Sequence, residues 1–512
     1  MRPKRTPPPG ALASQSASNP PRFVPSRPVP ALTDGFTSRL RGVCGSVHAD
    51  DAARVEAGRD WWPLSALWAL DGRSPCLPDL VAVPCSLAEV SAVASLCNRE
   101  KVPLTVFAGA SGVCGASIPL QSGVSMDMTA LHGISDVDAT SRTVEVRAGT
   151  FGHAFEDGLR SGYDLTVGHW PQSIALSTVG GWVACRGAGQ LSTRYGKIED
   201  MVTALEVVLA DGTVVHTGGA YPRSATGPDL TQLFVGSEGT LGVITSVRLR
   251  AHKVPPAKSK FAYGFTDFES GLEACRRVLQ RGATPAVLRL YDSAESERHF
   301  AGVGACVLLV ADEADPVILD AVTKVVAEEC SEASQLGAEL VDRWFERRNE
   351  IPDIASLVAA GLVVDTVEVA GSWRALPAIY AEALSALRSL EGTVAASAHQ
   401  SHAYSDGACL YFTFAGRTGA SARAGHRARL EAASPSGRPE GDAEVFYRAA
   451  FDAVTHAALR NGGTVSHHHG VGLNRSGYMR EHLGGGLDVL RSLKAALDPN
   501  GILNPGKLGL VQ

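Results

Sequence analysis

Long apolar runs, paired cysteine motifs and an excess of positive charge are all missing from this 512-residue sequence. No apolar run approaches the roughly 18 to 20 residues that cross a bilayer, so we expect no transmembrane segment. The N-terminus is basic but has no apolar stretch after it, which argues against a secretory signal. No repeat of fixed period is present, which argues against a repeat architecture.

The ten cysteines form no Cys-x-x-Cys pair, and most of them lie in apolar stretches. This usage is typical of reduced, buried thiols and excludes a disulfide framework or a zinc cage, so we expect a cytoplasmic protein. Lysine and arginine number 47 against 53 aspartates and glutamates, a net charge of −6. A dedicated nucleic-acid binder would show a basic excess, so no nucleic-acid partner is expected.

The chain does have 45% hydrophobic residues and 54 glycines, which is enough for a large core. Residues 1–33 are rich in proline, serine and alanine and predict a disordered tail. A strand is predicted over 79–84, followed by a helix that Ser86-Leu-Ala-Glu89 would open as a capping box. A second strand over 102–107 completes a β-α-β unit.

The rest of the region 34–253 predicts many more strands. Thr150 is expected to cap a helix that continues to residue 159, and Ala210-Asp-Gly212 predicts a hairpin turn. The expected strands of this part are 124–128, 143–148, 204–209, 213–216 and 243–249. We therefore predict an α+β domain over 34–253, ending at the proline-containing segment 253–258.

Residues 254–480 alternate strands with single helices, which predicts a second α+β domain built on an antiparallel sheet with helices on one face. The expected strands are 261–265, 286–291, 306–311, 363–368, 394–397, 408–414 and 463–466. The expected helices are 269–279, 316–329 and 443–460, and a surface loop is predicted over 416–441. A last helix over 488–497 lies in a C-terminal segment, 481–512, that we expect to return to the first domain.

Three glycine-rich segments suit a flat ligand that carries phosphate. They are the turn 108–115 after a strand, the segment 169–189, and the segment 234–245, which contains Gly236-Ser-Glu-Gly-Thr-Leu-Gly242. Small residues let backbone N–H groups approach a phosphate oxygen. The turn is neither a P-loop nor a dinucleotide fingerprint of the Rossmann type.

In this order and spacing, the three segments resemble the FAD-binding domain of the vanillyl-alcohol oxidase and p-cresol methylhydroxylase family. The end of the chain, Asp498-Pro-Asn-Gly-Ile-Leu-Asn-Pro-Gly-Lys507, is similar to that of the D-lactate and glycolate-type members, which oxidise 2-hydroxy acids. Thr178–Trp182, Gly227–Asp229 and Ser466–Gly472 look most like the alkyldihydroxyacetone-phosphate synthases. The resemblance covers about residues 36–508 and implies an FAD-binding domain of two subdomains with a substrate-cap domain.

The resemblance implies FAD contacts in each of the three segments. No histidine stands near Gly109 or Ser111, although Cys114 and Cys185 lie in these segments, so we expect FAD to be held non-covalently. The implied cofactor-binding residues are Thr105, Val106, Phe107, Ala108, Gly109, Ala110, Ser111, Gln172, Ser173, Ser177, Thr178, Cys185, Arg186, Gly187, Ala188, Glu238, Gly239, Thr240, Leu241, Gly242, Val243 and Ile244.

Tyr411 and the run His467-His-His469 are the expected catalytic groups. Period-two alternation in 408–414 places Leu410, Phe412 and Phe414 on a core face and Tyr411 on the other. The resemblance matches Tyr411 to a catalytic acid, and neutral imidazoles suit general bases. In an extended backbone His467, His468 and His469 could not all ligate one ion, so no metal is expected.

Arg289, His169 and His399 are the expected substrate-binding residues, with His402 and Tyr404 close to His399 in the sequence. A buried arginine is costly unless it is paired, so Arg289 could bind a carboxylate or phosphate, with a structural ion pair as the open alternative.

Two departures from the synthases concern the substrate. Ile354 stands where the synthases have a substrate-binding arginine, with Arg347 and Arg348 six or seven residues earlier, and His399 replaces a second arginine. The guanidinium fork is lost with isoleucine, so we expect oxidation of a small hydroxy acid or related alcohol by hydride transfer to flavin N5. Synthase-like transfer without net redox and an inactive flavin-fold binding protein are the alternatives. A small-molecule substrate is the expected partner, and a homodimer is left open.

Overall fold

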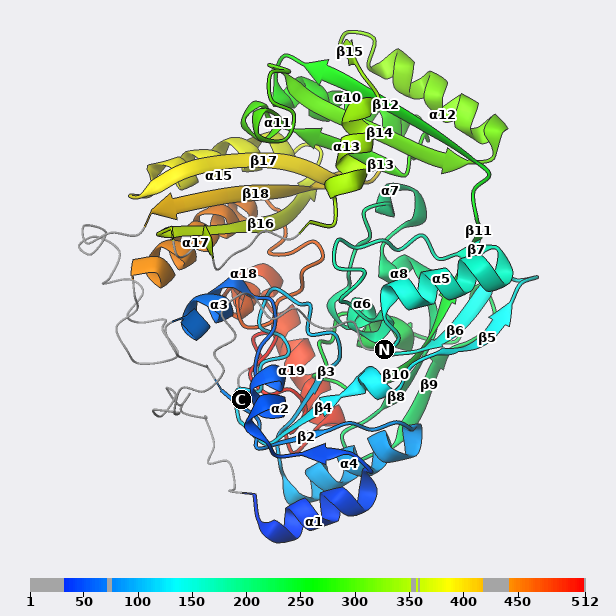
Figure 1. The fold of residues 1–512 in the computed structure, drawn as a ribbon, viewed down its shortest axis with the longest axis vertical. Coiled ribbons are helices and arrows are strands. Elements are labelled where there is room, and N and C mark those ends of the chain that lie inside the picture. The colour runs from blue at the N-terminus through cyan, green and yellow to red at the C-terminus, as the bar shows by residue number, and fades with distance from the viewer. Residues whose placement is uncertain (1–31, 71–75, 351–355, 358–359, 418–441, 511–512) are drawn as a thin grey trace.

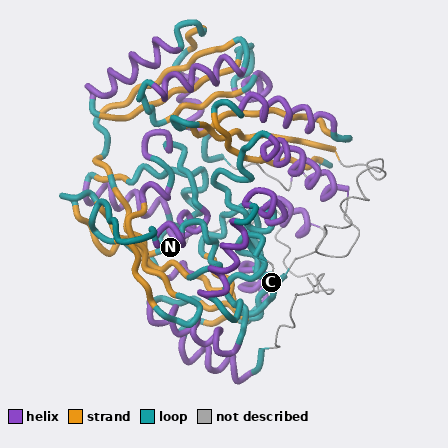
Figure 2. Tube along the Cα trace, turned by 180° about the vertical axis from the view of Figure 1, so that it is seen from behind, coloured by secondary structure: helices purple, strands orange, loops and turns teal. Residues whose placement is uncertain are grey.

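The computed structural model describes residues 32–70, 76–350, 356–357, 360–417 and 442–510 (Figure 1). The predicted tail up to residue 31, Ile354 and residues 418–441 of the predicted loop lie outside the described residues. A seven-stranded sheet occupies the upper part of Figure 1, and a four-stranded, a five-stranded and a two-stranded sheet lie below it. The view from behind in Figure 2 shows the same division.

The predicted β-α-β unit is confirmed. Strands β2 (Leu80–Ala82) and β3 (Leu104–Phe107) both pair in parallel with β4 (Val124–Asp127), and α4 (Leu87–Glu100) connects β2 to β3. Ser86 caps α4, since its side chain accepts a hydrogen bond from the Glu89 backbone N–H. Glu89 does not bond back to Ser86 but accepts from the backbone N–H groups of Gly45 and Cys85.

A five-stranded antiparallel sheet follows, in the order β5-β6-β10-β8-β9. The predicted hairpin at 210–212 joins β8 (Val202–Val208) to β9 (Val214–Gly218), as expected. The predicted Thr150 cap is wrong. Helix α5 (Gly152–Tyr163) begins after Phe151 without a side-chain cap, because the Thr150 hydroxyl donates to the Arg147 carbonyl and accepts from the Gly133 N–H.

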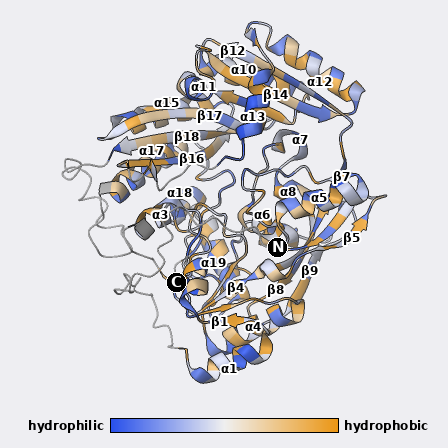
Figure 3. Ribbon diagram, in the orientation of Figure 1, coloured by the Kyte–Doolittle hydropathy of each residue, from blue (hydrophilic) through white to orange (hydrophobic). Residues whose placement is uncertain are grey.

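The seven-stranded sheet is antiparallel throughout, and helices cover one of its faces, as predicted. Helices α10 (Phe268–Gln280), α12 (Pro316–Glu329), α15 (Leu376–Ser389) and α17 (Asp442–Arg460) pack on that face in one hydrophobic cluster. The cluster includes Leu410, Phe412 and Phe414 of β18, so the predicted alternation is correct. The shorter helix α13 packs on the opposite face through Leu340, Val341 and Trp344, and in Figure 3 much of it is hydrophilic. The strand order is β15 (Ser334–Leu336), β12 (Ala257–Phe265), β14 (Cys306–Ala314), β13 (Val287–Tyr291), β17 (Thr393–Ala403), β18 (Gly407–Arg417) and β16 (Leu362–Ser372).

The chain after the sheet differs from the expectation at one point. The predicted strand 463–466 is wrong, because this segment leaves α17 as a loop that continues through the three histidines. The final segment runs beside β3, where Leu503 bridges Leu104 in parallel and the Asn504 N–H donates to the Leu104 carbonyl. The domain boundaries themselves stay a prediction.

The bounds of the other described elements are as follows. The helices are α1 (Asp34–Val43), α2 (Asp51–Ala57), α3 (Pro63–Leu70), α6 (Val179–Cys185), α7 (Ser192–Tyr195), α8 (Ile198–Met201), α9 (Leu230–Phe234), α11 (Ser293–His299), α13 (Glu339–Arg347), α18 (Met479–Leu483), α19 (Gly486–Leu497), η1 (Met128–Ala130) and η2 (Ser476–Tyr478). The strands are β1 (Val47–His48), β5 (Ile134–Asp138), β6 (Thr143–Arg147), β7 (Leu165–Thr166), β10 (Val243–Arg250) and β11 (His252–Lys253).

A buried lysine of α19 fastens the C-terminal segment. Lys494 Nζ donates to the carbonyls of Thr240 at 2.8 Å and Leu503 at 2.7 Å, and it pairs with the buried Asp498. Substitution of Lys494 by methionine would leave these acceptors and the Asp498 charge unpaired. We expect a loss of about 3 to 5 kcal/mol of stability, measured as a shift of the denaturation midpoint. The exposed Lys324→Met control should stay within about 0.5 kcal/mol, and an equal shift in both variants would contradict the role of Lys494.

Candidate active site

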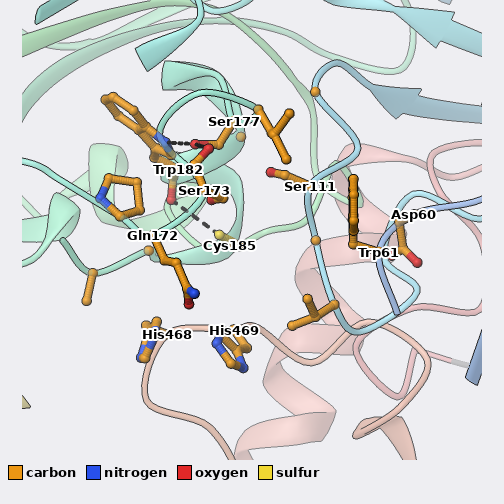
Figure 4. Close-up of a pocket in the computed structure, with 18 of the residues that line it drawn as sticks. Asp60, Trp61, Ser111, Gln172, Ser173, Ser177, Trp182, Cys185, His468 and His469 are labelled. Carbon is orange, nitrogen blue, oxygen red and sulfur yellow. Dashed lines mark hydrogen bonds between the residues drawn. The ribbon is translucent and has the colours of Figure 1, made fainter. Parts of the chain in front are cut away.

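A cavity of about 880 Å³ lies between the seven-stranded sheet and the smaller sheets. Its volume is at the upper end of small-molecule sites. The turns at 106–113, 171–178 and 184–190 form one wall, and residues of β13, α13, β17, β18 and the histidine loop form the other. In the close-up of Figure 4, His468 and His469 lie on a loop facing Gln172, Ser173 and Cys185, with Asp60 and Trp61 to one side.

Most of the predicted cofactor-binding residues do line this cavity. The exceptions are Thr105, which is buried in β3; Arg186, which lies beside Glu199; Thr240, whose hydroxyl donates to the Ser237 carbonyl; and Leu241, which belongs to the core. The residues on the wall are Val106, Phe107, Ala108, Gly109, Ala110, Ser111, Gln172, Ser173, Ser177, Thr178, Cys185, Gly187, Ala188, Glu238, Gly239, Gly242, Val243 and Ile244.

The wall has features that fit a large polar ligand such as FAD. Gly109 lies so close to the opposite turn that a Cβ there would meet the Leu176 carbonyl oxygen at 2.0 Å. The buried His169 has no hydrogen-bond partner for either ring nitrogen, and the Ser117 hydroxyl also lacks one. Both side chains line the cavity. Buried polar atoms without partners are costly, so a bound ligand with donors and acceptors would stabilise this wall.

Tyr411 and two of the predicted histidines meet at the cavity. The Tyr411 hydroxyl lies 2.7 Å from His468 Nε2 and 3.0 Å from His469 Nε2. The ring of His399 stacks on Tyr411 with centroids 5.0 Å apart and an interplanar angle of 9°. All four side chains line the cavity, so the structure brings together the predicted tyrosine, two members of the triple histidine and one predicted substrate-binding residue.

His467 does not line the cavity but lies behind His468. Its Nδ1 is 2.9 Å from His468 Nδ1, and its Nε2 is 3.1 Å from the Tyr404 hydroxyl. Ser192 continues the network, with its hydroxyl 3.3 Å from that of Tyr404 and 2.7 Å from His402 Nδ1. A hydrogen-bonded chain therefore runs from Tyr411 behind His468 to His402, which lines the cavity again.

Glu368 of β16 determines how this chain is protonated. Its carboxylate lies 3.7 Å from His469 Nδ1, which favours a proton on Nδ1 and leaves Nε2 as an acceptor. Tyr411 then donates to His469 and accepts from His468 Nε2, because one hydroxyl hydrogen can serve only one acceptor. The opposite assignment would direct a lone pair of His469 at the carboxylate.

Burial keeps the groups of this cluster neutral. Burial lowers the pKa of His469 to about 4 against the opposing effect of Glu368, and it lowers the pKa of His467 and His468 well below the usual value. Burial also holds the pKa of Tyr411 well above its ordinary value. The imidazoles are thus unprotonated at neutral pH, while Tyr411 keeps its proton.

The backbone of the three histidines is not extended, so the geometric reason for excluding a shared ion does not hold. Residues 467–469 form a bent loop, and two groups of possible ligands have atoms within 4.8 Å of one another: His402 with His467 and His468, and Glu368 with Cys409 and His468. The nitrogens of His467 and His468 hydrogen-bond each other in this arrangement. The absence of a metal stays a prediction.

The predicted substrate-binding residues all line the cavity. Arg289 Nε donates to the Tyr291 hydroxyl at 2.7 Å, and its Nη2 lies 2.6 Å from His399 Nε2. His399 is buried between Arg289 and Glu295, and burial lowers its pKa to about 4. His169 is on the cofactor side, where its ring lies 4.5 Å from that of Trp182, so it faces the predicted FAD wall and not Tyr411.

Sequence reasoning missed several residues of the wall. Asp60 accepts hydrogen bonds from the N–H groups of Trp62 and Gly115, and burial raises its pKa to about 7. No spacing signal in Asp60-Trp-Trp-Pro63 marked this segment. Arg343, Arg347 and Arg348 of the α13 region also line the cavity, although the latter two were noted only for their distance from Ile354.

Two family descriptions match this chain. Residues 78–218 match the family described as FAD binding domain, and residues 254–508 match FAD linked oxidases, C-terminal domain. The FAD-linked oxidoreductase YgcU of Escherichia coli O157:H7 is 31% identical over 84% of this chain and 89% of its own. The chain belongs to the FAD-linked oxidoreductase family. FAD is therefore the cofactor that this fold and its relatives support.

Other relatives of this chain carry different activities in their names. The glycolate oxidase subunit GlcD of Bacillus subtilis is 28% identical, over 93% of this chain and 97% of its own. A solved alkyldihydroxyacetonephosphate synthase superposes with a TM-score of 0.77 at 25% identity, covering 95% of this chain and 88% of that chain. A p-cresol methylhydroxylase shares the fold with a TM-score of 0.71 at 17% identity, over 94% and 99% of the two chains. The predicted fold class and family resemblance are confirmed.

The described helices of this flavoprotein include none with the length and apolarity to cross a membrane.

The contact at Gly109 makes a test of cofactor binding. A methyl group in Gly109→Ala would push the turn at 106–113 away from the Leu176 carbonyl. We expect FAD to bind the apoprotein at least about tenfold more weakly, a loss of ~1.4 kcal/mol measured by fluorescence titration. Gly112→Ala is the matched control, because its Cβ would lie 3.7 Å from Asp60 Oδ2 in ordinary contact. Equal FAD affinity in the two variants would contradict the role given to Gly109.

Proposed function

We propose that this FAD-linked oxidoreductase removes hydrogen from a small hydroxy compound, most simply a 2-hydroxy acid. The convergence of Tyr411, His468 and His469 on one cavity wall, facing the segments that match the FAD-binding family, carries this proposal. The printed name of the relative GlcD, a glycolate oxidase subunit, supports it. Bound FAD would supply the hydride acceptor at its N5.

The side chains of the site would handle the proton. Tyr411 would bind the substrate hydroxyl and relay its proton to His469 Nε2, which already accepts from Tyr411 in the assignment above. Glu368, 3.7 Å from the far nitrogen, would stabilise the imidazolium that forms. His468 would hold the Tyr411 oxygen in place through its Nε2–H. The substrate thus loses one proton to His469 and one hydride.

We propose further that FAD is held without a covalent bond. Burial raises the pKa of Cys185 to about 12, which keeps this cavity-lining thiol neutral and weakly nucleophilic. Acid precipitation should therefore release all the flavin into the supernatant. The cytoplasmic location and the homodimer stay expectations from the sequence.

The synthase reaction is the second candidate, favoured by the superposition on alkyldihydroxyacetonephosphate synthase. Incorporation of a fatty alcohol into acyl-dihydroxyacetone phosphate, with no bleaching of the flavin by any hydroxy acid, would decide for it. Anaerobic bleaching of the flavin band by 2-hydroxy acids would decide for oxidation. A protein that binds FAD and does neither would be the inactive alternative.

Tyr411 gives the first test of the oxidation mechanism. Tyr411→Phe removes the hydroxyl that joins the substrate to His469, so we expect the rate of anaerobic flavin reduction to fall by about 100-fold. Tyr380→Phe is the control, because its hydroxyl lies 3.4 Å from Asp292 Oδ2 away from the cavity. A Tyr411→Phe variant with the original rate would remove Tyr411 from the reaction.

The pH dependence gives a second test. A base whose pKa is lowered stays unprotonated down to that pKa, and the pKa of His469 is about 4. We expect kcat/KM to stay level from pH 8 downward and to fall only as the pH approaches about 4, since protonated His469 cannot accept a proton. A fall centred near pH 6.5 would show an ordinary solvated imidazole and contradict the assignment.

A further inference from the structure

Arg348, at the end of α13, is a half-buried cation that forms no ion pair within the described part of the chain, and Glu313 offsets its burial only from a distance. It lines the cavity, and its buried Nη1 has no hydrogen-bond partner. Burial lowers the pKa of its guanidinium, which shows how strongly the site desolvates it. Such a cation is unfavourable alone, and an anion in the cavity would offset that cost.

Aromatic rings hold Arg348 in place without using its hydrogen bonds. Its guanidinium carbon lies 4.9 Å from the centroid of Phe345, 5.6 Å from Trp344 and 6.0 Å from Trp170. Cation–π contacts position the group, but they leave its N–H donors free for a ligand. The Arg348 carbonyl also accepts from Gln190 Nε2, which ties this end of α13 to the opposite wall.

Arg289 is a second cation on the same aromatic ring. Its guanidinium carbon lies 5.9 Å from the Trp344 centroid, on which Arg348 also packs. Its hydrogen-bond partners among the described residues are neutral: the Tyr291 hydroxyl and His399. His399 stacks on Tyr411, so Arg289 is one side chain away from the reacting groups.

Two other arginines of the cavity are already paired, and Arg343, which also lines it, is exposed to solvent. Arg298 pairs with Glu295, and Arg347 pairs with Glu350 at 3.1 Å. Glu238 faces the N–H groups of Val471 and Gly472. Arg289 and Arg348 therefore stand out as cavity-lining cations that keep donors for a ligand.

We propose that Arg289 and Arg348 form one subsite that binds the anionic group of the substrate, a carboxylate or a phosphate. Their guanidinium carbons lie 5.9 and 5.6 Å from the centroid of the same Trp344 ring, so both cations belong to one stretch of the cavity wall. Position 354 holds isoleucine and not arginine, but Arg348 at the end of α13 and Arg289 of β13 supply an anion site in its place. The identity of this anion as part of an oxidised substrate rests on the proposed function, whereas the binding of an anion by the two arginines does not.

The test measures binding to the FAD-loaded protein by calorimetry, with oxalate and inorganic phosphate as probes and glycerol as the neutral reference. Arg348→Met and Arg289→Met should each weaken the preferred anion by at least about tenfold and leave glycerol unchanged. Arg348→Lys keeps the charge and should recover part of the affinity, which a purely structural role would not. The control is Arg277→Met, whose guanidinium pairs with Glu329 on the outer helices.

Each outcome has one meaning. Tighter binding of oxalate identifies a carboxylate, and tighter binding of phosphate identifies a phosphate ester. Anion binding that the arginine variants do not change, or no saturable binding of either probe, overturns the subsite. Arginine-dependent binding without flavin bleaching by any hydroxy acid would keep the subsite and reject the oxidation. Bleaching by a hydroxy acid with an unchanged KM in both arginine variants would keep the oxidation and reject the subsite.

Discussion

The arrangement of the site depends on a buried carboxylate, Glu368. It accepts hydrogen bonds from the Ser466 hydroxyl and from the N–H groups of His467 and His469, and Arg475 lies 3.3 Å away. Hydrogen bonds to a charged acceptor contribute about 1.5 to 3 kcal/mol each. Burial alone would raise the pKa of Glu368, but Arg475 and His469 hold it below the usual value, so the carboxylate stays charged. The loop that carries the three histidines takes its bend from this charge.

The same loop is also held from the cofactor side. Glu238, from the segment 234–245 that is predicted to bind FAD, accepts from the N–H groups of Val471 and Gly472. Arg475 continues the link, since it donates to the Gly470 carbonyl and to Cys114 Sγ, next to the 108–115 turn. Each half of the molecule thus contributes one glutamate to the histidine loop.

The sequence predicted those parts that local rules decide. The alternation in β18 placed Tyr411, and Ser86 marked the start of α4, because strand period and helix caps are properties of a few adjacent residues. The Thr150 cap failed because Gly133, distant in the chain, supplied a competing donor. The bend at His467–His469 was invisible for the same reason, since Glu368 lies about 100 residues earlier. Arg348 faces the cavity only because α13 packs on the less expected face of the sheet.

Residues 466–472 are bound by both Glu368 and Glu238, which limits how the two halves of the molecule can move. If the two halves opened like a hinge, the loop would have to leave either Glu238 or Glu368, and a buried charge would lose its N–H partners. The exposed part of the cavity wall includes Arg343 and Arg347 of α13. A loop held from both halves in this way would keep the reacting groups in fixed positions during turnover.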